Sequence, residues 1–570
     1  MKRISIHFSK GTGAILFCAT LLISLLLSLL TLSSPSPKNR ENDFSSERAF
    51  CHIEAIAPLQ HSVFDTIEIE DVRNYIEETL DAFEHVKWAR VKHASVDVVN
   101  QKTHTKEPID IQNIYAEIPG KSEICLLIMA HYDSSPYKEK YGVGTAGSYG
   151  AADDGYGVAT MLEIMRILND YASNNELVNG VKFAFTDAEE VGLYGATALT
   201  KEFSYWLQDV NILLNLEARG NKGPLYMFQT GNYNYKLIKF YSQTRLPFSL
   251  SVAADVYKYL PNDTDFTPFL KLGYPGLNFA TLNSLKFYHT PLDNLQNSDK
   301  ATLQFYGEQI LPLVLEYIGN PQYSARTCFV SNEDTVFFTL FPGFLMYYSH
   351  TVSWIIIFLA TLAAALIAFF ALRKRAVSWK KTLLALGIWM LFLICAALTG
   401  LLLAKGIGAV THNRFQLLYM PYVPFDGGFV LIFALLVMVA GFFVFKRCRK
   451  LECSPNDILS GSILLFLILT LLSAFLLHGA TILFVWPTIF MTALLEDSLL
   501  DRQTSKWQII KNHLVNTLAV LTTSIMFIIL IYSLFLALTF GALAVILLFT
   551  AIYTCALVSY GFSQPSCRRF

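Results

Sequence analysis

The chain has 570 residues, 53% of them hydrophobic and only 16% charged, a composition that excludes an intrinsically disordered chain and a small disulfide-rich scaffold. Its formal net charge of −1 is an average over unlike segments, with +5 over residues 1–40, −16 over 41–340 and +10 over 341–570. Because the excess positive charge flanks apolar runs, the chain is neither a uniformly soluble enzyme nor a basic nucleic-acid-binding protein.

The first predicted element is an apolar helix over residues 13–33 that follows three basic residues. About 20 apolar residues are enough to cross a bilayer. A cleaved signal peptide is the alternative, but the apolar run is long and Ser33–Pro37 has no clear small-x-small cleavage site. We therefore expect a short cytoplasmic N-terminus, residues 1–12, followed by an uncleaved signal-anchor helix.

Residues 40–335 are predicted to form a soluble domain of alternating strands and helices. Apolar periodicity predicts strands over 109–118, 123–130, 181–186, 212–216, 225–229 and 276–280, and helices over 70–86, 157–168, 193–203 and 300–318. Several strands are continuous apolar runs, as in buried sheets. The alternation predicts an α/β fold, with a mixed, mostly parallel sheet sandwiched by helices. Whether Cys51 and Cys328 form a disulfide is left open by the sequence.

Side chains able to bind a metal stand at the ends of these strands and in the turns after them. They are His131, Asp133, Asp153, Glu189, Glu190, Glu217 and His289. Imidazole and carboxylate together suit zinc, and cobalt or manganese would also be compatible with these ligand types. Each feature alone is more often structural than functional. Five such clusters in one domain, in the region where α/β proteins bind ligands, indicate a metal site.

The order of these motifs, H-x-D, D-D-G-x-G, E-E-V-G-L, N-L-E and Y-H-T, resembles the co-catalytic di-zinc exopeptidases related to bacterial leucyl aminopeptidase, glutaminyl cyclase and glutamate carboxypeptidase. The sequences N-L-E-A-R-G, N-D-T-D-F and Y-H-T-P-L-D-N are most similar to a membrane-bound branch, which includes the endoplasmic-reticulum metallopeptidase and the fungal vacuolar membrane protease. The resemblance covers roughly residues 100–320 and implies a zinc aminopeptidase-like fold.

The resemblance implies that five residues hold two zinc ions: His131 and Glu217 on one ion, Glu190 and His289 on the other, and Asp153 bridging both. It also implies that Glu189 is the general base for a water molecule held between the metals and that Asp133 orients His131. No ligand position of the family pattern is missing, which argues against a degenerate, non-catalytic member.

Two residues next to these motifs are candidates for substrate binding. Arg219 could bind a substrate carboxylate, or it could pair with Asp133 or Asp265. Tyr288 could donate a hydrogen bond to the oxygen of a tetrahedral intermediate, or it could only pack. The sequence leaves these alternatives open.

Residues 350–562 are predicted to form an all-α, multi-pass transmembrane domain, with spans over 350–372, 382–404, 427–445, 460–478, 480–496, 514–537 and 540–562. Lys and Arg gather between the spans and in a cytoplasmic tail at 563–570. Since cytoplasmic loops attract these residues, eight spans in all would keep every cluster inside and residues 40–335 outside. The count of eight spans depends on Leu477–Gly479, which must form a tight turn between two helices. One continuous segment there would change the number of spans from even to odd.

Together these observations predict a membrane-anchored di-zinc exopeptidase, most simply an aminopeptidase, that acts on peptides at the non-cytoplasmic side of a lipid bilayer. Glutaminyl cyclase-like or carboxypeptidase activity is the alternative within the family. A peptide-binding transporter or scaffold is the alternative from another class. The spans carry few charged residues, which favours anchoring or homo-oligomerisation over ion-coupled transport. With one glycosylation sequon found, at Asn262–Thr264, we favour a bacterial inner membrane over an endoplasmic-reticulum or vacuolar membrane.

Overall fold

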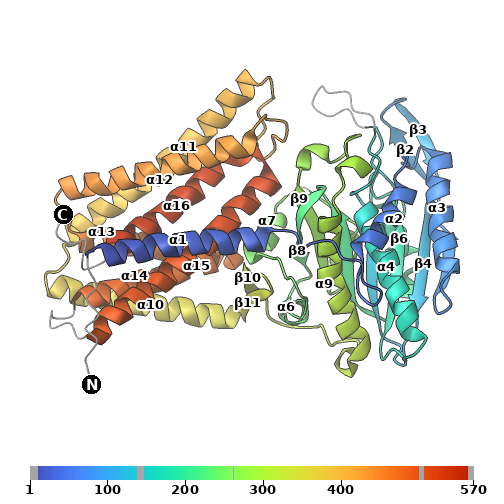
Figure 1. Cartoon of the computed structure of the whole chain (residues 1–570), viewed down its shortest axis with the longest axis horizontal. Helices are drawn as coiled ribbons and strands as arrows, with labels where there is room; N and C mark the ends of the chain where they lie inside the picture. The colour runs from blue at the N-terminus through green and yellow to red at the C-terminus, as the bar shows by residue number, and fades with distance from the viewer. Residues whose placement is uncertain (1–9, 138–146, 261, 500–505, 563–570) are drawn as a thin grey trace. The chain divides into compact units, whose positions relative to one another are not determined.

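The computed structural model describes residues 10–137, 147–260, 262–499 and 506–562. The chain divides into two compact units, one of residues 32–347 and the other of residues 1–31 with 348–570 (Figure 1). Residues 1–9 of the predicted cytoplasmic N-terminus and the predicted tail 563–570 lie outside the described residues, as does the basic residue Arg502.

The first unit is built on a seven-stranded sheet with the order β1-β4-β6-β5-β7-β9-β8. The strands are β1 (Lys87–Lys92), β4 (Gln112–Ile118), β5 (Cys125–His131), β6 (Gly180–Thr186), β7 (Val210–Ala218), β8 (Lys222–Thr230) and β9 (Gly276–Asn283). Adjacent strands are parallel from β6 through β5 and β7 to β9, whereas β1–β4, β4–β6 and β8–β9 are antiparallel pairs. Five of these seven described strands thus run in one direction, and the predicted mixed, mostly parallel sheet is confirmed.

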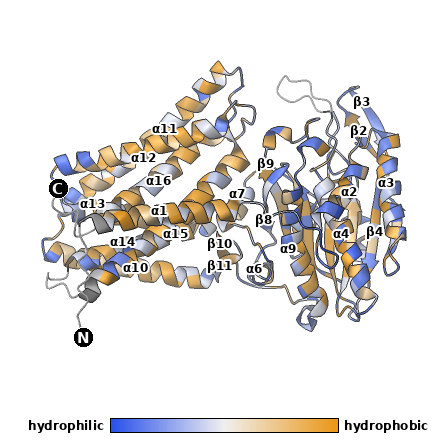
Figure 2. Cartoon of the chain, viewed as in Figure 1, coloured by the Kyte–Doolittle hydropathy of each residue, from blue (hydrophilic) through white to orange (hydrophobic). Residues whose placement is uncertain are grey.

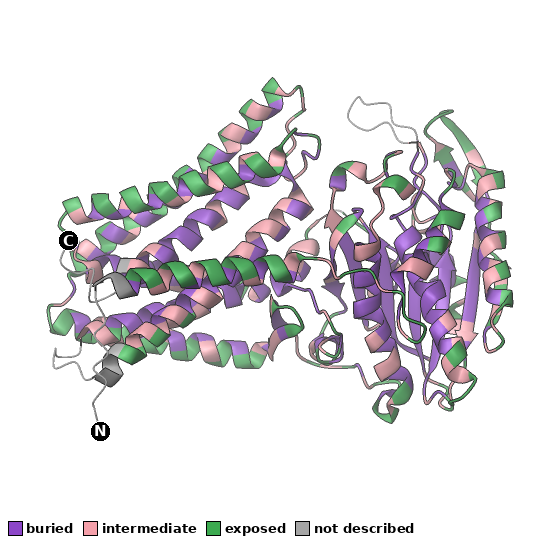
Figure 3. Cartoon of the chain, viewed as in Figure 1, coloured by how far each residue is buried: buried purple, intermediate pink, exposed green. Residues whose placement is uncertain are grey.

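Helices cover both faces of this sheet: α2 (Ser46–Ile56), α3 (Thr66–Asp81), α4 (Gly155–Ala172), α5 (Tyr194–Lys201), α6 (Tyr235–Tyr241), α7 (Ser251–Tyr257), α8 (Phe266–Lys271) and α9 (Lys300–Gly319). On one face α2, α4 and α9 pack together and contact β5, β7 and β8. On the other, α5 and α8 contribute to a core with Tyr115, Leu127 and Leu213. Every residue of β5, β6 and β7 is consequently buried, as their apolar runs predict (Figure 3).

Two hairpins lie outside this sheet, one of β2 (Val96–Asn100) with β3 (Thr105–Ile109) and one of β10 (Thr335–Phe341) with β11 (Phe344–Ser349). The predicted strand 109–118 was wrong at its start, because Ile109 ends β3 and the chain enters β4 only at Gln112. The intervening Asp110 is exposed and pairs with Lys92, as suits a turn between strands. Cys51 and Cys328 are both free thiols.

The second unit consists of α1 (Lys10–Leu32), α10 (His350–Arg373), α11 (Trp379–Val410), α12 (Asp426–Lys450), α13 (Pro455–Leu476), α14 (Thr481–Leu499), α15 (Lys506–Leu538) and α16 (Leu543–Phe562). Within the described residues, eight helical segments are long and apolar enough to cross a membrane, the number that the hydropathy predicts (Figure 2). The chain breaks at Leu477 and the short turn His478–Ala480, so that α13 and α14 are separate helices. The direction in which each helix crosses stays a prediction.

Candidate metal centre

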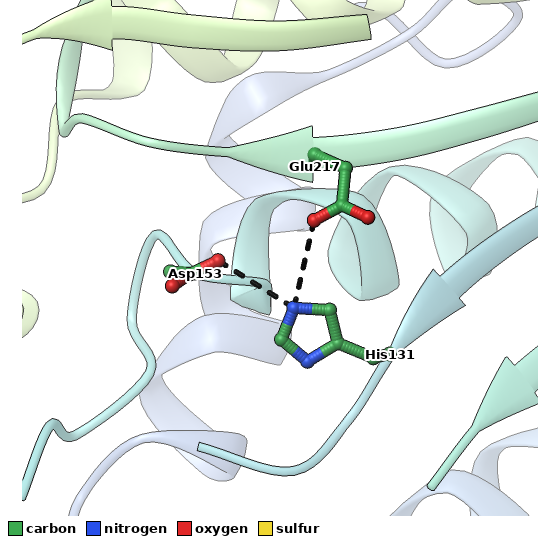
Figure 4. Close-up of side chains that lie close together, drawn as sticks. All are labelled: His131, Asp153 and Glu217. Carbon is green, nitrogen blue, oxygen red and sulfur yellow. Dashed lines mark ion pairs between the residues drawn. The ribbon is translucent and has the colours of Figure 1, made fainter. Parts of the chain in front are cut away.

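The site lies at the carboxyl ends of β5 and β7, which are neighbours in the sheet and run parallel, so their ends share one edge. His131 is the last residue of β5, and Glu217 is the penultimate residue of β7. The His131 Nε2 atom lies 3.5 Å from Asp153 Oδ1 and 3.7 Å from Glu217 Oε2 (Figure 4). These three side chains, from a strand, a turn and another strand, form the first group of potential metal ligands.

A second group consists of Asp153, Glu190 and His289. The His289 Nε2 atom lies 2.8 Å from Glu190 Oε1 and 3.2 Å from Asp153 Oδ2. In each group the potential ligand atoms all lie within 4.8 Å of one another. Asp153 belongs to both groups, with Oδ1 near His131 and Oδ2 near His289. The structure therefore brings together the five residues that the sequence analysis assigns to metal binding.

The ring of His131 is oriented to bind a cation. Its Nδ1 atom is 2.9 Å from the backbone carbonyl oxygen of Asp133, which can only accept a hydrogen bond, so Nδ1 carries a proton. Its Nε2 atom is buried and has no hydrogen-bond partner among the described residues. Burial alone would lower the pKa of His131, but the neighbouring carboxylates of Asp133, Asp153 and Glu189 raise the pKa well above its usual value. These carboxylates favour positive charge beside the buried Nε2 atom, which a bound metal ion would supply.

Asp133 also holds the segment that carries the two adjacent glutamates. Its carboxylate accepts hydrogen bonds from the backbone N–H groups of Glu189 (3.0 Å) and Glu190 (3.3 Å). The same carboxylate lies 3.5 Å from Nδ1 of His131. Asp133 thereby links a ligand of the first group to a ligand of the second.

The turn that carries Asp153 is fixed from both sides. The Asp154 carboxylate caps α4 by accepting from the Gly157 N–H group at 3.1 Å, and a Cβ atom at Gly157 would lie only 2.2 Å from Asp154 Oδ2. Before the helix, the buried Asp293 accepts hydrogen bonds from the N–H groups of Ala152 (2.8 Å) and Asp153 (3.2 Å). Sequence reasoning missed this role of Asp293, although the residue lies in the quoted Y-H-T-P-L-D-N motif.

Glu217 is supported by a buried amide chain. Asn215 donates from Nδ2 to Glu217 Oε1 and to Asn278 Oδ1, both at 3.0 Å. Burial, together with the neighbouring Asp265 and Asp153, raises the pKa of Glu217 to about 8, while His131 opposes the shift. A bound cation would offset this crowding of acidic groups. Asn215 belongs to the quoted N-L-E motif, whereas Asn278 lies in a region that the sequence suggests only as a hydrophobic strand.

A buried ion pair ties two of the motif segments to helix α3. Arg73 donates from Nη2 to Asp187 Oδ2 at 2.8 Å and from Nε to the Tyr132 hydroxyl at 2.7 Å. Tyr132 lies between His131 and Asp133, and Asp187 stands two residues before Glu189. Sequence reasoning missed this contact, because Arg73 is 114 residues from Asp187 along the chain.

Glu189 belongs to neither group of potential ligands. Burial raises the pKa of its carboxyl well above the ordinary value; His131 opposes this shift, and Glu217 and Glu190 add to it. The charges of both groups therefore influence the Glu189 carboxyl, although it belongs to neither.

The two candidate substrate-binding residues contact each other. The Tyr288 ring stacks on the His289 ring, with 3.6 Å between centroids, and the Arg219 guanidinium carbon lies 5.8 Å from the Tyr288 centroid. Arg219 forms no ion pair with Asp133 or Asp265 in the described part of the chain. Those two carboxylates instead accept hydrogen bonds from backbone N–H groups and from Thr186, respectively.

Comparison with known proteins also indicates a peptidase domain. Residues 113–314 match the model of Peptidase family M28. The vacuolar membrane protease of Clavispora lusitaniae is 28% identical over 307 residues, covering 51% of this chain and 28% of that protein. The putative endoplasmic reticulum metallopeptidase 1 of Schizosaccharomyces pombe is 28% identical over 421 residues, covering 69% of this chain and 48% of that protein. The chain thus spans less than half the length of these relatives.

Among solved structures, a Zn-dependent exopeptidase from Parabacteroides distasonis matches with 21% identity and a TM-score of 0.37, covering 49% of this chain and 99% of that one. The region matched by the family model contains all five residues of the two ligand groups as well as Glu189. Residues 113–314 are therefore similar to peptidase family M28, and endoplasmic reticulum metallopeptidases and vacuolar membrane proteases are among the relatives of the chain.

Proposed function

We propose that the chain is a membrane-anchored, zinc-dependent exopeptidase that removes N-terminal residues from peptides. The observation that carries the proposal is the pair of ligand groups that share Asp153, with Glu189 next to Glu190 in the chain and outside both groups. His131 and Glu217 would hold one zinc ion, Glu190 and His289 the other, and Asp153 would contribute to both. Similarity to a metallopeptidase family and the names of the relatives support the assignment.

Two zinc ions in these positions would polarise the scissile carbonyl group and lower the pKa of the attacking water. Glu189 would take a proton from that water and deliver it to the leaving amine. Tyr288 would donate a hydrogen bond to the negative charge that develops on the carbonyl oxygen. Burial raises the pKa of Tyr288 well above its ordinary value, and the nearby Asp153 and Glu190 add to the shift, so its phenol stays protonated as a donor.

The proposal is tested on the full chain, purified in detergent and loaded with zinc. We expect two zinc ions per chain, release of free leucine from leucyl peptides, and loss of hydrolysis on chelation that added zinc restores. Release of a free amino acid would exclude a cyclase, since cyclisation uses no attacking water. Metal content below one ion per chain, with no hydrolysis of any peptide, would contradict the proposal in favour of a peptide-binding module.

We further propose that the peptidase unit faces the non-cytoplasmic side, in a bacterial inner membrane, on the basis of the Lys and Arg clusters and the sparse sequons. Cys51 is exposed on α2 and offers a native probe of that side. A membrane-impermeant maleimide should label Cys51 in intact cells that express the chain, and Cys51→Ser should abolish that label. Labelling of Cys51 only after the cells are permeabilised would reverse the assignment.

A further inference from the structure

The partly buried arginines of the peptidase unit fall into two kinds. Four of them pair with carboxylates at 2.5–2.8 Å, namely Arg48, Arg73, Arg90 and Arg166. Arg219 is also partly buried, yet it forms no ion pair with any residue that the structure describes. Partial burial of a guanidinium costs free energy because hydration is lost. The other four arginines regain part of this cost in an ion pair, and Arg219 does not.

The position of Arg219 relates it directly to the metal centre. Its backbone N–H donates to the Thr281 carbonyl oxygen at 2.9 Å, which continues the β7–β9 ladder beyond the last residue of β7. Arg219 comes directly after the last residue of β7 and two residues after Glu217 in the chain. The Arg219 guanidinium also lies over the ring of Tyr288, which stacks on the ring of His289.

The two motif carboxylates that were considered as ion-pair partners of Arg219 have other partners. Asp133 accepts two backbone hydrogen bonds, and Asp265 accepts one from Thr186. An anion brought in by the substrate would supply the ion-pair partner that the described residues do not provide. We propose that Arg219 binds a carboxylate of the peptide substrate close to the scissile bond, an inference that rests on the proposed peptidase function.

A carboxylate in this place has two chemical sources. One is the C-terminal carboxylate of a dipeptide, and the other is the side chain of an acidic residue after the cleaved bond. Both fit the planar fork of an arginine, which binds carboxylate through two parallel hydrogen bonds. In either case Arg219 makes the enzyme selective for substrates with a negative charge beside the cleavage site.

The experiment compares Leu-Ala, Leu-Ala-amide and Leu-Glu-amide with the zinc-loaded full chain. We expect kcat/KM to be about 10- to 100-fold higher for at least one carboxylate-bearing substrate than for Leu-Ala-amide, as one charge-assisted contact would give. Preference for Leu-Ala would identify the C-terminal carboxylate, and preference for Leu-Glu-amide would identify the side chain. Arg219→Gln should remove the preference, so that its kcat/KM values for the three substrates become similar.

Two further variants sharpen the result. Arg219→Lys should retain only part of the preference, because lysine keeps the charge without the fork. Lys222→Gln removes an exposed positive charge three residues away and should change nothing. Two results would overturn the inference while leaving the peptidase assignment intact. One is an equal kcat/KM of the wild-type chain for the three substrates, and the other is an equal loss of kcat/KM for all three in Arg219→Gln.

A binding measurement keeps the test independent of turnover. In the Glu189→Gln background, calorimetry should detect tighter binding of Leu-Ala or Leu-Glu-amide than of Leu-Ala-amide, and Arg219→Gln should abolish the difference. Absence of any hydrolysis by the wild-type chain would refute the proposed function. Absence of this difference in affinity would refute the role of Arg219.

Discussion

Asp153→Asn is expected to lose zinc from both positions and to hydrolyse leucyl peptides about 1,000-fold more slowly than the wild type, or slower still. Asp153 offers one oxygen to the group with His131 and the other to the group with His289. Asparagine replaces one of these oxygens with an NH2 group, which does not ligate, and removes the negative charge. Losing several kcal/mol of transition-state stabilisation by the metals corresponds to about this factor.

Metal content distinguishes this loss from a general defect. Glu217→Gln changes a residue of one group only, so we expect it to lose one zinc ion where Asp153→Asn loses two. Asp263→Asn removes an exposed carboxylate of the nearby N-D-T-D-F motif and should retain both ions and full activity. Elemental analysis of the purified variants gives the count, and circular dichroism checks the fold. Two bound zinc ions in Asp153→Asn would contradict the shared role.

The sequence predicts the central strands well because their burial leaves a simple pattern. Strands β5, β6 and β7 are buried along their whole length, so each has a mostly apolar sequence. The edge strand β1 has the sequence KWARVK, with three basic residues and only partly buried side chains, and apolar periodicity does not reveal it. Apolar periodicity does not predict the hairpin of β2 and β3 for the same reason, because its residues are mostly polar.

The membrane helices were predictable from hydropathy alone, but their ends were not. The predicted span 382–404 lies inside α11, which extends from Trp379 to Val410 and includes Lys405. Helix α13 begins at Pro455, five residues before the apolar run, because Ser454 and Asp457 form a reciprocal capping box. Helix boundaries of this kind depend on local hydrogen bonds, whereas hydropathy reports only the apolar centre.

In the candidate site, the sequence indicated the potential metal ligands and the supporting residue Asp133, but not the supporting roles of Asp293 and Arg73. Histidine and acidic residues at strand ends are conspicuous by type and position. Asp293 and Arg73 are ordinary residue types, and their importance comes from contacts made across long stretches of chain. Asp293, for example, accepts from the Asp153 N–H group 140 residues away. Such contacts follow from the tertiary structure and leave no local pattern.

Glu189→Gln should separate catalysis from metal binding. Glutamine is close to glutamate in size and keeps one oxygen, but it cannot accept a proton from water at neutral pH. Because Glu189 belongs to neither ligand group, both zinc ions should stay bound. Loss of a general base costs about 100- to 10,000-fold, and we expect kcat for leucyl peptide hydrolysis to fall by that amount.

The neighbouring glutamate provides the matched comparison. Glu190→Gln alters a ligand of the second group, so its loss of activity should be accompanied by loss of zinc, unlike that of Glu189→Gln. Glu176→Gln changes an exposed glutamate of the same unit and should alter neither quantity. If Glu189→Gln kept full activity with both ions bound, the proton would have to be carried by another group. If it lost zinc as Glu190→Gln does, Glu189 would be a ligand instead of a base. Only the combination of retained metal and lost turnover places Glu189 at the proton transfer step.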